Sequence, residues 1–328
     1  MKAAVNWPMV LKKREGLLAS RPSTYIWVIL IAILVGVASQ FRARTIFACQ
    51  ADGYNADQYI AYCNGASYAD YEHGAFWFDL EPAVQDFARN AGVLFLGNSR
   101  LQVAFSTVAT DNFFSAISAR YYLLGFTYNE NVIMAEELLR KMKPRAKVYV
   151  INVDDFFDRA ESVPMKAVLH DPGARDRYEV KRRWQQVHEP ICKTLPVLCG
   201  DGSVVVRSRE TGAYRKFPII KETMTPISYD WVINQNVVKS NVSVAIDFLS
   251  HLAVPRECVI LTMVPTVETK IGNVTAIAEA LGENLMTPEL VGGLQTFDGS
   301  HLDKPSAERW SQAFFRAVGS KIRTCLGI

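Results

Sequence analysis

Three residues of this chain have the types and spacing of an activated serine nucleophile. Ser99 follows the run Val-Leu-Phe-Leu-Gly-Asn at 93–98, so we expect it at the tip of a buried strand. Near the other end of the chain, Asp298 stands three residues before His301 in a short Gly/Ser turn. A serine hydroxyl becomes a nucleophile when a base removes its proton. A carboxylate on one nitrogen of a histidine leaves the other nitrogen free to act as that base. Together the three side chains predict a Ser/His/Asp catalytic set.

The turn before Ser99 suits this role. A strand-to-helix turn exposes a side chain at the carboxyl edge of a parallel sheet, where sites in open α/β folds form. It also directs backbone N–H groups at a developing oxyanion. We expect Gly97 to permit a tight turn and Asn98 to tolerate unusual backbone angles. Taken alone, Ser99 has a simpler interpretation, in which it only caps the next helix.

Among the histidines, His301 has the most suitable surroundings. It follows a turn, has an aspartate three residues earlier and precedes an expected helix. For Asp298 and His301 alone, the alternative is an ordinary surface turn. The chain holds five histidines in all: His73, His170, His188, His251 and His301.

Elements that alternate along the chain must position these residues. Alternating strands and helices with short links predict an α/β fold with a doubly wound parallel sheet. The segment 156–238 breaks this rhythm and reads as an inserted subdomain, with a charged stretch at 175–183. We take that stretch as a solvated helix face, with membrane phosphates or an anionic glycan as the alternative contact. Residues 46–75 read as a loop region. Helices are expected at 79–90, 110–118, 129–143, 240–252, 272–281 and 306–318, and strands at 93–96, 120–124, 147–153 and 258–263.

The N-terminal region has a separate character. Residues 1–23 form a basic segment, and residues 24–41 are apolar and long enough for a transmembrane anchor. The cations before the span favour a cytoplasmic N-terminus. A linker region at 42–89 would then lead to an extracytoplasmic domain at 90–328. A cleaved signal peptide and a buried core helix remain the alternatives.

Cysteine usage agrees with an exported body. All six cysteines follow the apolar segment. The close spacings favour disulfides 49–63 and 192–199, which leave 258–325 as the third, although other connectivities and buried reduced thiols stay open.

Composition excludes several classes of partner. A formal charge of +3 is too mild for a nucleic-acid-binding protein. Neither Cys-x-x-Cys nor His-x-x-x-His spacing occurs, so we expect no metal and no cofactor.

The two motifs resemble those of the SGNH (GDSL-like) hydrolase and acyltransferase superfamily, which has a flavodoxin-like sheet. The likeness covers roughly residues 90–155 and 240–320, and the tail 298–306 before a helix is its most specific part. It implies Ser99 as nucleophile, His301 as general base and acid, and Asp298 as the orienting carboxylate. It also implies an oxyanion hole that includes the N–H groups of Ser99 and Gly125.

Two positions depart from that family pattern. Asn98 stands where the first motif usually has aspartate. Asp154 stands where the third motif usually has the asparagine of the oxyanion hole, and a carboxylate there would oppose a developing negative charge. Asn152 is the candidate replacement. Arg100 is expected to pair with Asp154 or Asp155, with binding of an anionic substrate by Arg100 and Asp154 as the alternative.

A single span with such a domain resembles the D-alanyl transfer and periplasmic polysaccharide acetylation proteins. That resemblance implies a serine acyltransferase in the bacterial inner membrane, with its body in the periplasm. Ser99 would pass an acetyl-like group to a cell-surface glycan, with a membrane-bound O-acyltransferase as partner. The alternatives are an anchored carboxylesterase or deacetylase and a non-catalytic assembly subunit. We expect residues 24–41 to contact the bilayer, and we expect no nucleic acid as a partner.

Overall fold

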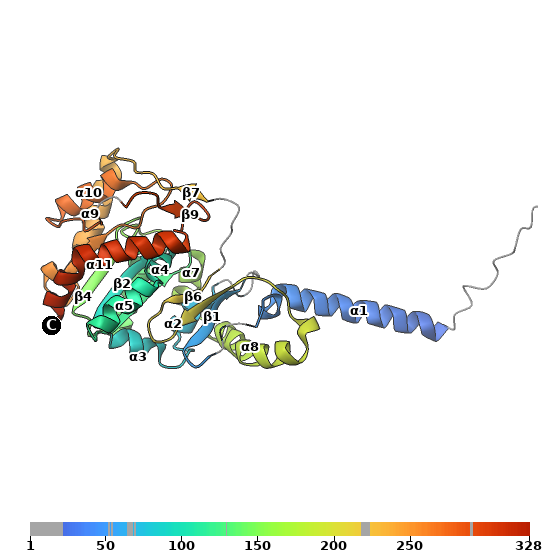
Figure 1. Ribbon diagram of the computed structural model, residues 1–328. Helices are drawn as coiled ribbons and strands as arrows, with labels where there is room; N and C mark the ends of the chain where they lie inside the picture. The colour runs from blue at the N-terminus through green and yellow to red at the C-terminus, as the bar shows by residue number, and fades with distance from the viewer. Residues whose placement is uncertain are drawn as a thin grey trace, which may run out of the picture.

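The computed structural model describes residues 22–51, 53, 55–63, 68, 70–128, 130–217, 224–288 and 291–328. Most of the predicted basic segment 1–23 lies outside these residues. A body of sheets and helices carries one long N-terminal helix that projects from it (Figure 1).

The body is an α/β fold built on a parallel sheet, as expected. Its strands are fully buried and follow the order β3-β2-β4-β8. Burial on both faces explains why each strand is a nearly continuous apolar run. The strands are β2 (Val93–Asn98), β3 (Tyr121–Phe126), β4 (Val148–Asn152) and β8 (Val259–Thr262).

Helices cover both faces of this sheet. One face packs on α4 (Ser99–Phe105), α5 (Val108–Ala116) and α11 (Lys304–Leu326) through a cluster of aromatic rings. The other packs on α6 (Val132–Met142), α9 (Gln235–Ser250) and α10 (Ile271–Ala280). Helix α11 is longer than the expected 306–318: it begins after the capping side chain of Asp303 and ends at Leu326, before Gly327, which has a positive φ.

A second, antiparallel sheet lies beside the first. It has the order β1-β5-β6, with β1 (Gln58–Cys63), β5 (Val204–Ser208) and β6 (Tyr214–Lys216). The expectation of a loop over 46–75 is therefore wrong, because β1 and the first residues of α2 (Tyr71–Trp77) lie there. The expected helix 79–90 is reduced to α3 (Val84–Arg89), which follows a left-handed Ala83. Strand β1 pairs with a strand of the predicted insertion, so these two distant segments share one sheet.

Several further elements belong to the insertion and the connections. The insertion holds α7 (Val163–His170), α8 (Ala174–Thr194), the short helix η2 (Pro196–Leu198) and β7 (Thr225–Pro226). Strand β7 pairs with β9 (Gln295–Thr296) just before the Asp298–His301 turn. The remaining short helices are η1 (Ile46–Ala48) and η4 (Arg256–Cys258).

A buried ion pair joins the two sheets. The guanidinium of Arg207 contacts Glu72 at 2.8 Å, and both side chains are fully buried. Arg207 also donates to the carbonyl of Leu123 in β3 at 2.7 Å, and the hydroxyl of Tyr214 donates to Glu72. Loss of one partner would leave an uncompensated buried charge, at a cost of about 3–5 kcal/mol. These contacts therefore fix the small sheet against the main one.

The three predicted disulfides are confirmed. Cys49–Cys63 ties η1 to β1, Cys192–Cys199 closes the turn after α8, and Cys258–Cys325 links the start of β8 to α11. Disulfides persist in oxidising compartments, which suggests an extracytoplasmic body.

The N-terminal helix α1 (Pro22–Arg44) is the one candidate membrane span in the described residues. It is long and apolar enough to cross a bilayer, and none of its span is buried against the body. The alternative of a buried core helix is therefore wrong. The helix leaves the body on the side where β9 leads into α11 (Figure 1).

Candidate active site

Ser99 is the first residue of α4, at the carboxyl end of β2. Asn98 precedes it in an ordinary extended conformation and caps the helix, since its Oδ1 accepts the N–H of Arg100 at 3.0 Å. The interpretation of Ser99 as the cap is therefore wrong, and so is the expectation of unusual angles at Asn98. Gly97 is needed for close packing, because a Cβ there would lie 3.0 Å from Leu101 and 3.2 Å from Asn152.

The predicted Ser/His/Asp side chains lie in one hydrogen-bonded chain. The hydroxyl of Ser99 contacts Nε2 of His301 at 2.8 Å, and Nδ1 of His301 contacts Oδ2 of Asp298 at 2.7 Å. With Asp298 ionised, Nδ1 of His301 carries the ring proton and donates a hydrogen bond to the carboxylate. Nε2 is then the acceptor for the serine proton, which is the arrangement that a nucleophilic serine requires.

The second oxygen of Asp298 holds the turn itself. Its Oδ1 accepts the backbone N–H groups of Ser300 at 2.9 Å and His301 at 2.8 Å. Burial by itself would raise the pKa of Asp298, but the hydrogen bonds and charge of His301 and the two backbone N–H groups bring that pKa below its usual value. The carboxyl group is therefore an anion at neutral pH, as the tautomer of His301 requires.

The turn at 297–303 carries the predicted catalytic residues Asp298 and His301, and we name it the catalytic turn; it is anchored at both ends. The N–H of Phe297 donates to the carbonyl of His301 at 3.0 Å, and the N–H of Asp303 donates to Gln295 in β9 at 3.0 Å. Gly299 adopts a φ of +83°, a conformation that favours glycine. The N–H of Val267, in the loop after β8, donates to Gly299 at 3.3 Å. Position 301 is thus held by the neighbouring strand and by the start of α11.

Arg100 connects three parts of the site. Its Nε donates to the hydroxyl of Ser300 at 2.9 Å, while its Nη1 pairs with Asp154 and lies 3.6 Å from Asp155. The expected pairing is confirmed, whereas substrate contact by Arg100 or Asp154 stays a prediction. Burial and the charge of Asp155 raise the pKa of Asp154, and the guanidinium opposes this shift. The pairing offsets the negative charge that the sequence places near the expected oxyanion.

The remaining predicted oxyanion donors lie on the neighbouring strands. Gly125 in β3 faces the backbone of the nucleophile turn so closely that a Cβ would lie 2.8 Å from the carbonyl of Asn98. Asn152 at the end of β4 is fully buried, and its Oδ1 accepts the N–H of Val264 at 2.9 Å. Within the described residues, its Nδ2 has no hydrogen-bond partner. An unpaired buried donor is costly and is often functional, but the oxyanion role of these residues stays a prediction.

Some contacts of the site were not foreseen. Phe297 stacks on the ring of His301 at 5.7 Å between centroids, and Phe217 stacks on Phe297 at 6.0 Å. Ser300 lies within the motif that singled out Asp298 and His301, so its bond to Arg100 could have been suspected. No short-range pattern connects Phe217, in the insertion, with this turn.

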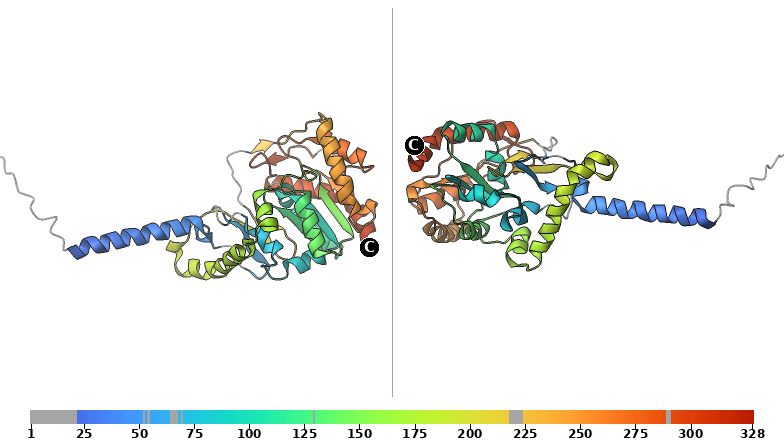
Figure 2. Two further views of the ribbon diagram at one scale, coloured as in Figure 1. Left: turned by 180° about the vertical axis from the view of Figure 1, so that it is seen from behind. Right: turned by 90° about the horizontal axis from the view of Figure 1, so that it is seen from below.

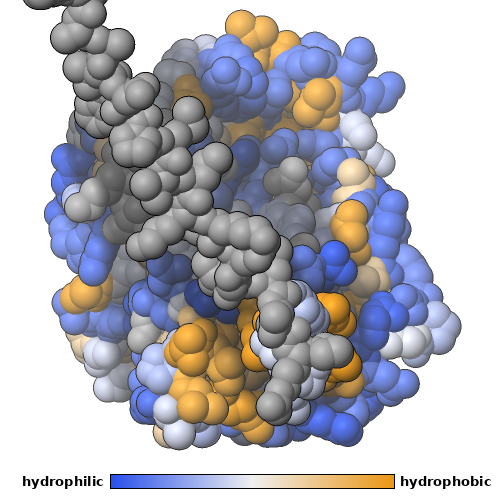
Figure 3. All heavy atoms as spheres, turned by 90° about the vertical axis from the view of Figure 1, so that its right-hand side faces the viewer, coloured by the Kyte–Doolittle hydropathy of each residue, from blue (hydrophilic) through white to orange (hydrophobic). Residues whose placement is uncertain are grey.

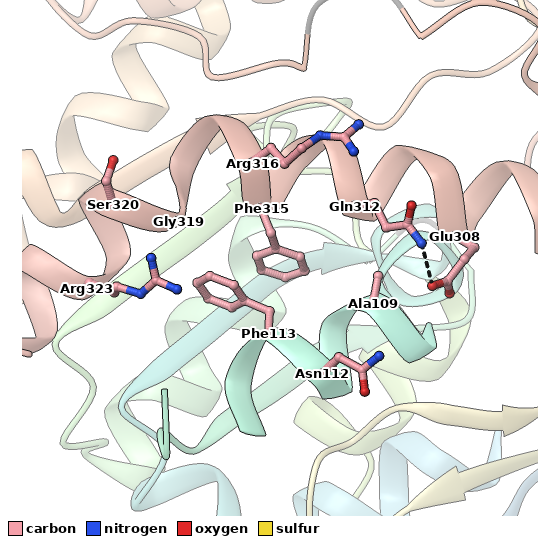
Figure 4. A pocket seen from close by; sticks show the side chains of 10 residues that line it. All are labelled: Ala109, Asn112, Phe113, Glu308, Gln312, Phe315, Arg316, Gly319, Ser320 and Arg323. Carbon is pink, nitrogen blue, oxygen red and sulfur yellow. Dashed lines mark hydrogen bonds between the residues drawn. The ribbon is translucent and has the colours of Figure 1, made fainter. Parts of the chain in front are cut away.

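Two other features are separate from this chemistry. A cavity of about 650 Å³ lies between α5 and α11, where Phe113 and Phe315 stack at 4.4 Å (Figure 4). Among the described residues, the group that could hold a metal ion is His188 with Cys192 and Cys199. Those two cysteines form a disulfide and offer no thiolate.

No protein-family model, curated protein or solved structure matches this chain. The likeness to SGNH enzymes stays a prediction that rests on the motifs described above.

Proposed function

We propose that this protein is a membrane-anchored SGNH-type serine acyltransferase that moves an acetyl-like group onto a cell-surface glycan. The observation that carries the proposal is the hydrogen-bonded chain from Ser99 through His301 to Asp298. The order of the parallel strands and the place of Ser99 after β2 support a flavodoxin-like SGNH domain.

The first half of the reaction forms an acyl-serine. The oxygen of Ser99 attacks the carbonyl carbon of the donor while Nε2 of His301 takes the hydroxyl proton. The bond to the donor's leaving group then breaks, and His301 returns the proton to that group. Backbone N–H groups at Ser99 and Gly125, with the amide of Asn152, are the proposed donors to the oxyanion.

The second half transfers the acyl group. A glycan hydroxyl gives its proton to Nε2 of His301, and its oxygen attacks the acyl-serine carbonyl. The bond to Oγ of Ser99 breaks, and the serine recovers the proton. The same steps with water as acceptor describe an esterase, so the acceptor alone separates these two functions.

The placement of the site favours work beside a membrane. Helix α1 leaves the body on the side that carries the catalytic turn (Figure 1). Disulfides suggest an oxidising compartment for the body. We place α1 in the bacterial inner membrane with the body in the periplasm, where a membrane-bound O-acyltransferase would supply the acyl group.

The test compares cells and purified protein. In cells that make the glycan, Ser99→Ala should abolish its acylation, whereas Ser115→Ala, an exposed serine of α5, should leave it unchanged. Without an acceptor, the purified protein should release the chromophore from a chromogenic acetyl ester slowly; a glycan acceptor should speed this release, because the acyl group then passes from Ser99 to the glycan instead of to water. Fast hydrolysis without any acceptor would support the esterase. Unchanged glycan acylation in the Ser99→Ala strain would refute the transferase.

A further inference from the structure

An apolar surface of the body, separate from the apolar side chains of α1 itself, lies next to the base of α1. It consists of exposed side chains at the end of α8 and in the turn that follows, and we name it the α8 tip: Trp184, Val187, Leu195, Val197 and Leu198. Val197 is the most exposed of the five, at 79%. Exposed apolar residues that gather in one place mark an interaction surface.

The turn that carries this surface is held in shape. The disulfide Cys192–Cys199 closes it, and η2 fills it. The N–H of Leu198 donates to the carbonyl of Leu195 at 3.0 Å, and the N–H of Cys199 donates to Pro196 at 3.0 Å. The apolar side chains are thus presented outward by a closed loop and not by a loose segment.

Aromatic contacts fix the α8 tip beside α1. Phe41, near the end of α1, lies 5.3 Å from the ring of Trp184, and Phe47 lies 5.8 Å from the same ring. Phe47 also contacts His188 of α8 at 5.3 Å. The C-terminal end of α8 lies alongside the base of α1 in both views of Figure 2. Figure 3 faces the side from which α1 projects, and apolar side chains gather in its lower part, where α1 points toward the viewer.

Basic side chains surround the same place. Arg42 and Arg44 are exposed at the end of α1, and Arg183 is exposed on α8. Lys193 of α8 is also exposed and is paired with Glu189. Cations next to a span are attracted to anionic lipid headgroups, and tryptophan favours the membrane–water interface. The combination of an apolar loop, an interfacial tryptophan and flanking cations matches the chemistry of a lipid surface.

We propose that the α8 tip is seated in the headgroup–acyl boundary of the bilayer that α1 crosses. The inference rests on α1 as a membrane span, and the proposed acyl transfer is not needed for it. Two contacts, α1 and the α8 tip, then hold the body at a set tilt on the membrane. The loop between β9 and α11, which carries the catalytic turn, lies on the side of the body from which α1 emerges (Figure 1), so this tilt turns that side toward the membrane surface.

The test measures the depth of single labels on the full-length protein. All six native cysteines are in disulfides, so an added cysteine is the one free thiol for an environment-sensitive fluorophore. The protein is reconstituted in vesicles of phosphatidylcholine with a third of phosphatidylglycerol. Val187→Cys and Val197→Cys probe the α8 tip. Ile246→Cys, an exposed aliphatic position on α9, is the matched control away from α1, and Ser39→Cys reports on α1.

At positions 187 and 197 we expect blue-shifted emission and quenching by lipids that carry a quencher in the upper acyl chain. That quenching should be several-fold stronger than at position 246, where aqueous iodide should quench instead. If position 39 is quenched by lipid but 187 and 197 behave like 246, the α8 tip faces water and the inference is wrong. If neither lipid nor iodide quenches positions 187 and 197, a protein surface covers the α8 tip, which also contradicts the proposal.

Discussion

Asp298→Asn separates the catalytic role of this side chain from its structural one. The two oxygens of Asp298 have different partners: Oδ1 accepts two backbone N–H groups of the turn, and Oδ2 accepts Nδ1–H of His301. The amide oxygen of asparagine can keep the backbone bonds, and asparagine is favoured in such turns. Its NH₂ group would then face Nδ1 and donate to it. That moves the ring proton to Nε2, where it prevents His301 from accepting the proton of Ser99.

The size of the expected loss in rate follows from the change of tautomer at His301. A wrong tautomer with intact geometry lowers the rate of a serine hydrolase by about 10⁴, which corresponds to about 5.4 kcal/mol at about 1.36 kcal/mol for each factor of ten. The turn keeps its backbone bonds, so thermal stability should change little. The expected signature is a large loss of reactivity in a folded protein.

The assay is the rate at which a fluorophosphonate labels Ser99 in the purified full-length protein. Asp303→Asn is the matched control, because Asp303 only caps α11 by accepting the N–H of Ser306 and asparagine caps equally well. We expect Asp303→Asn to react like the wild type and Asp298→Asn to react about 10⁴-fold more slowly. A rate for Asp298→Asn within tenfold of the wild type would refute the assigned tautomer and the role of Asp298.

Three further predictions concern Arg100 beside the site, two of the disulfides and the buried His73. Arg100→Lys should slow labelling of Ser99 about tenfold. Lysine cannot pair with Asp154 and also donate to Ser300, and the loss of one charged hydrogen bond costs about 1.5 kcal/mol. A wild-type labelling rate would mean that the catalytic turn does not depend on Arg100. Replacing both cysteines of a disulfide by alanine should lower the free energy of unfolding by about 4 kcal/mol for 258–325 and by about 2 kcal/mol for 192–199. The difference follows from the loops that the two disulfides close, which span 67 and 7 residues. Equal losses of free energy in urea unfolding would contradict this ranking. Burial acts to lower the pKa of His73, but Glu130, at 2.9 Å, raises that pKa overall. The native protein should therefore lose stability as the pH rises above about 6.5 through the folded-state pKa of His73. This prediction would be contradicted if the melting temperatures of the wild type and of His73→Gln fell in parallel over that range.

The main sheet was accessible from sequence because its strands are buried on both faces. Continuous apolar runs such as 93–96 and 148–151 predict parallel strands, and the strands were found within two residues of their expected ends. The small sheet was not accessible in this way. Gln58–Cys63 is a mixed run of polar, aromatic and small residues, and its partner Val204–Ser208 lies far along the chain. Its strand character depends on pairing with that distant partner, which no local pattern shows.

The hydrogen-bonded set of Ser99, His301 and Asp298 was predictable because each residue lies in a short motif whose residue types have a chemical reason. The spacing of Asp298 and His301 allows the hydrogen bond between them within a single turn. The support around them was predicted only in part. The pairing of Arg100 with Asp154 was expected, but the bond from Arg100 to Ser300 and the stacking of Phe217 join segments that are distant in sequence. The role of Asn98 was misread because its capping bond depends on where α4 begins, and helix ends are poorly defined by sequence.

The central claim is that His301 activates Ser99. Its most direct test is the identification by peptide mass spectrometry of the residue that a fluorophosphonate modifies in the native full-length protein. The account predicts a single adduct on Ser99 that is lost in His301→Ala and in denatured protein. A native protein without an adduct on Ser99, or an adduct that forms equally fast in folded His301→Ala, would contradict it.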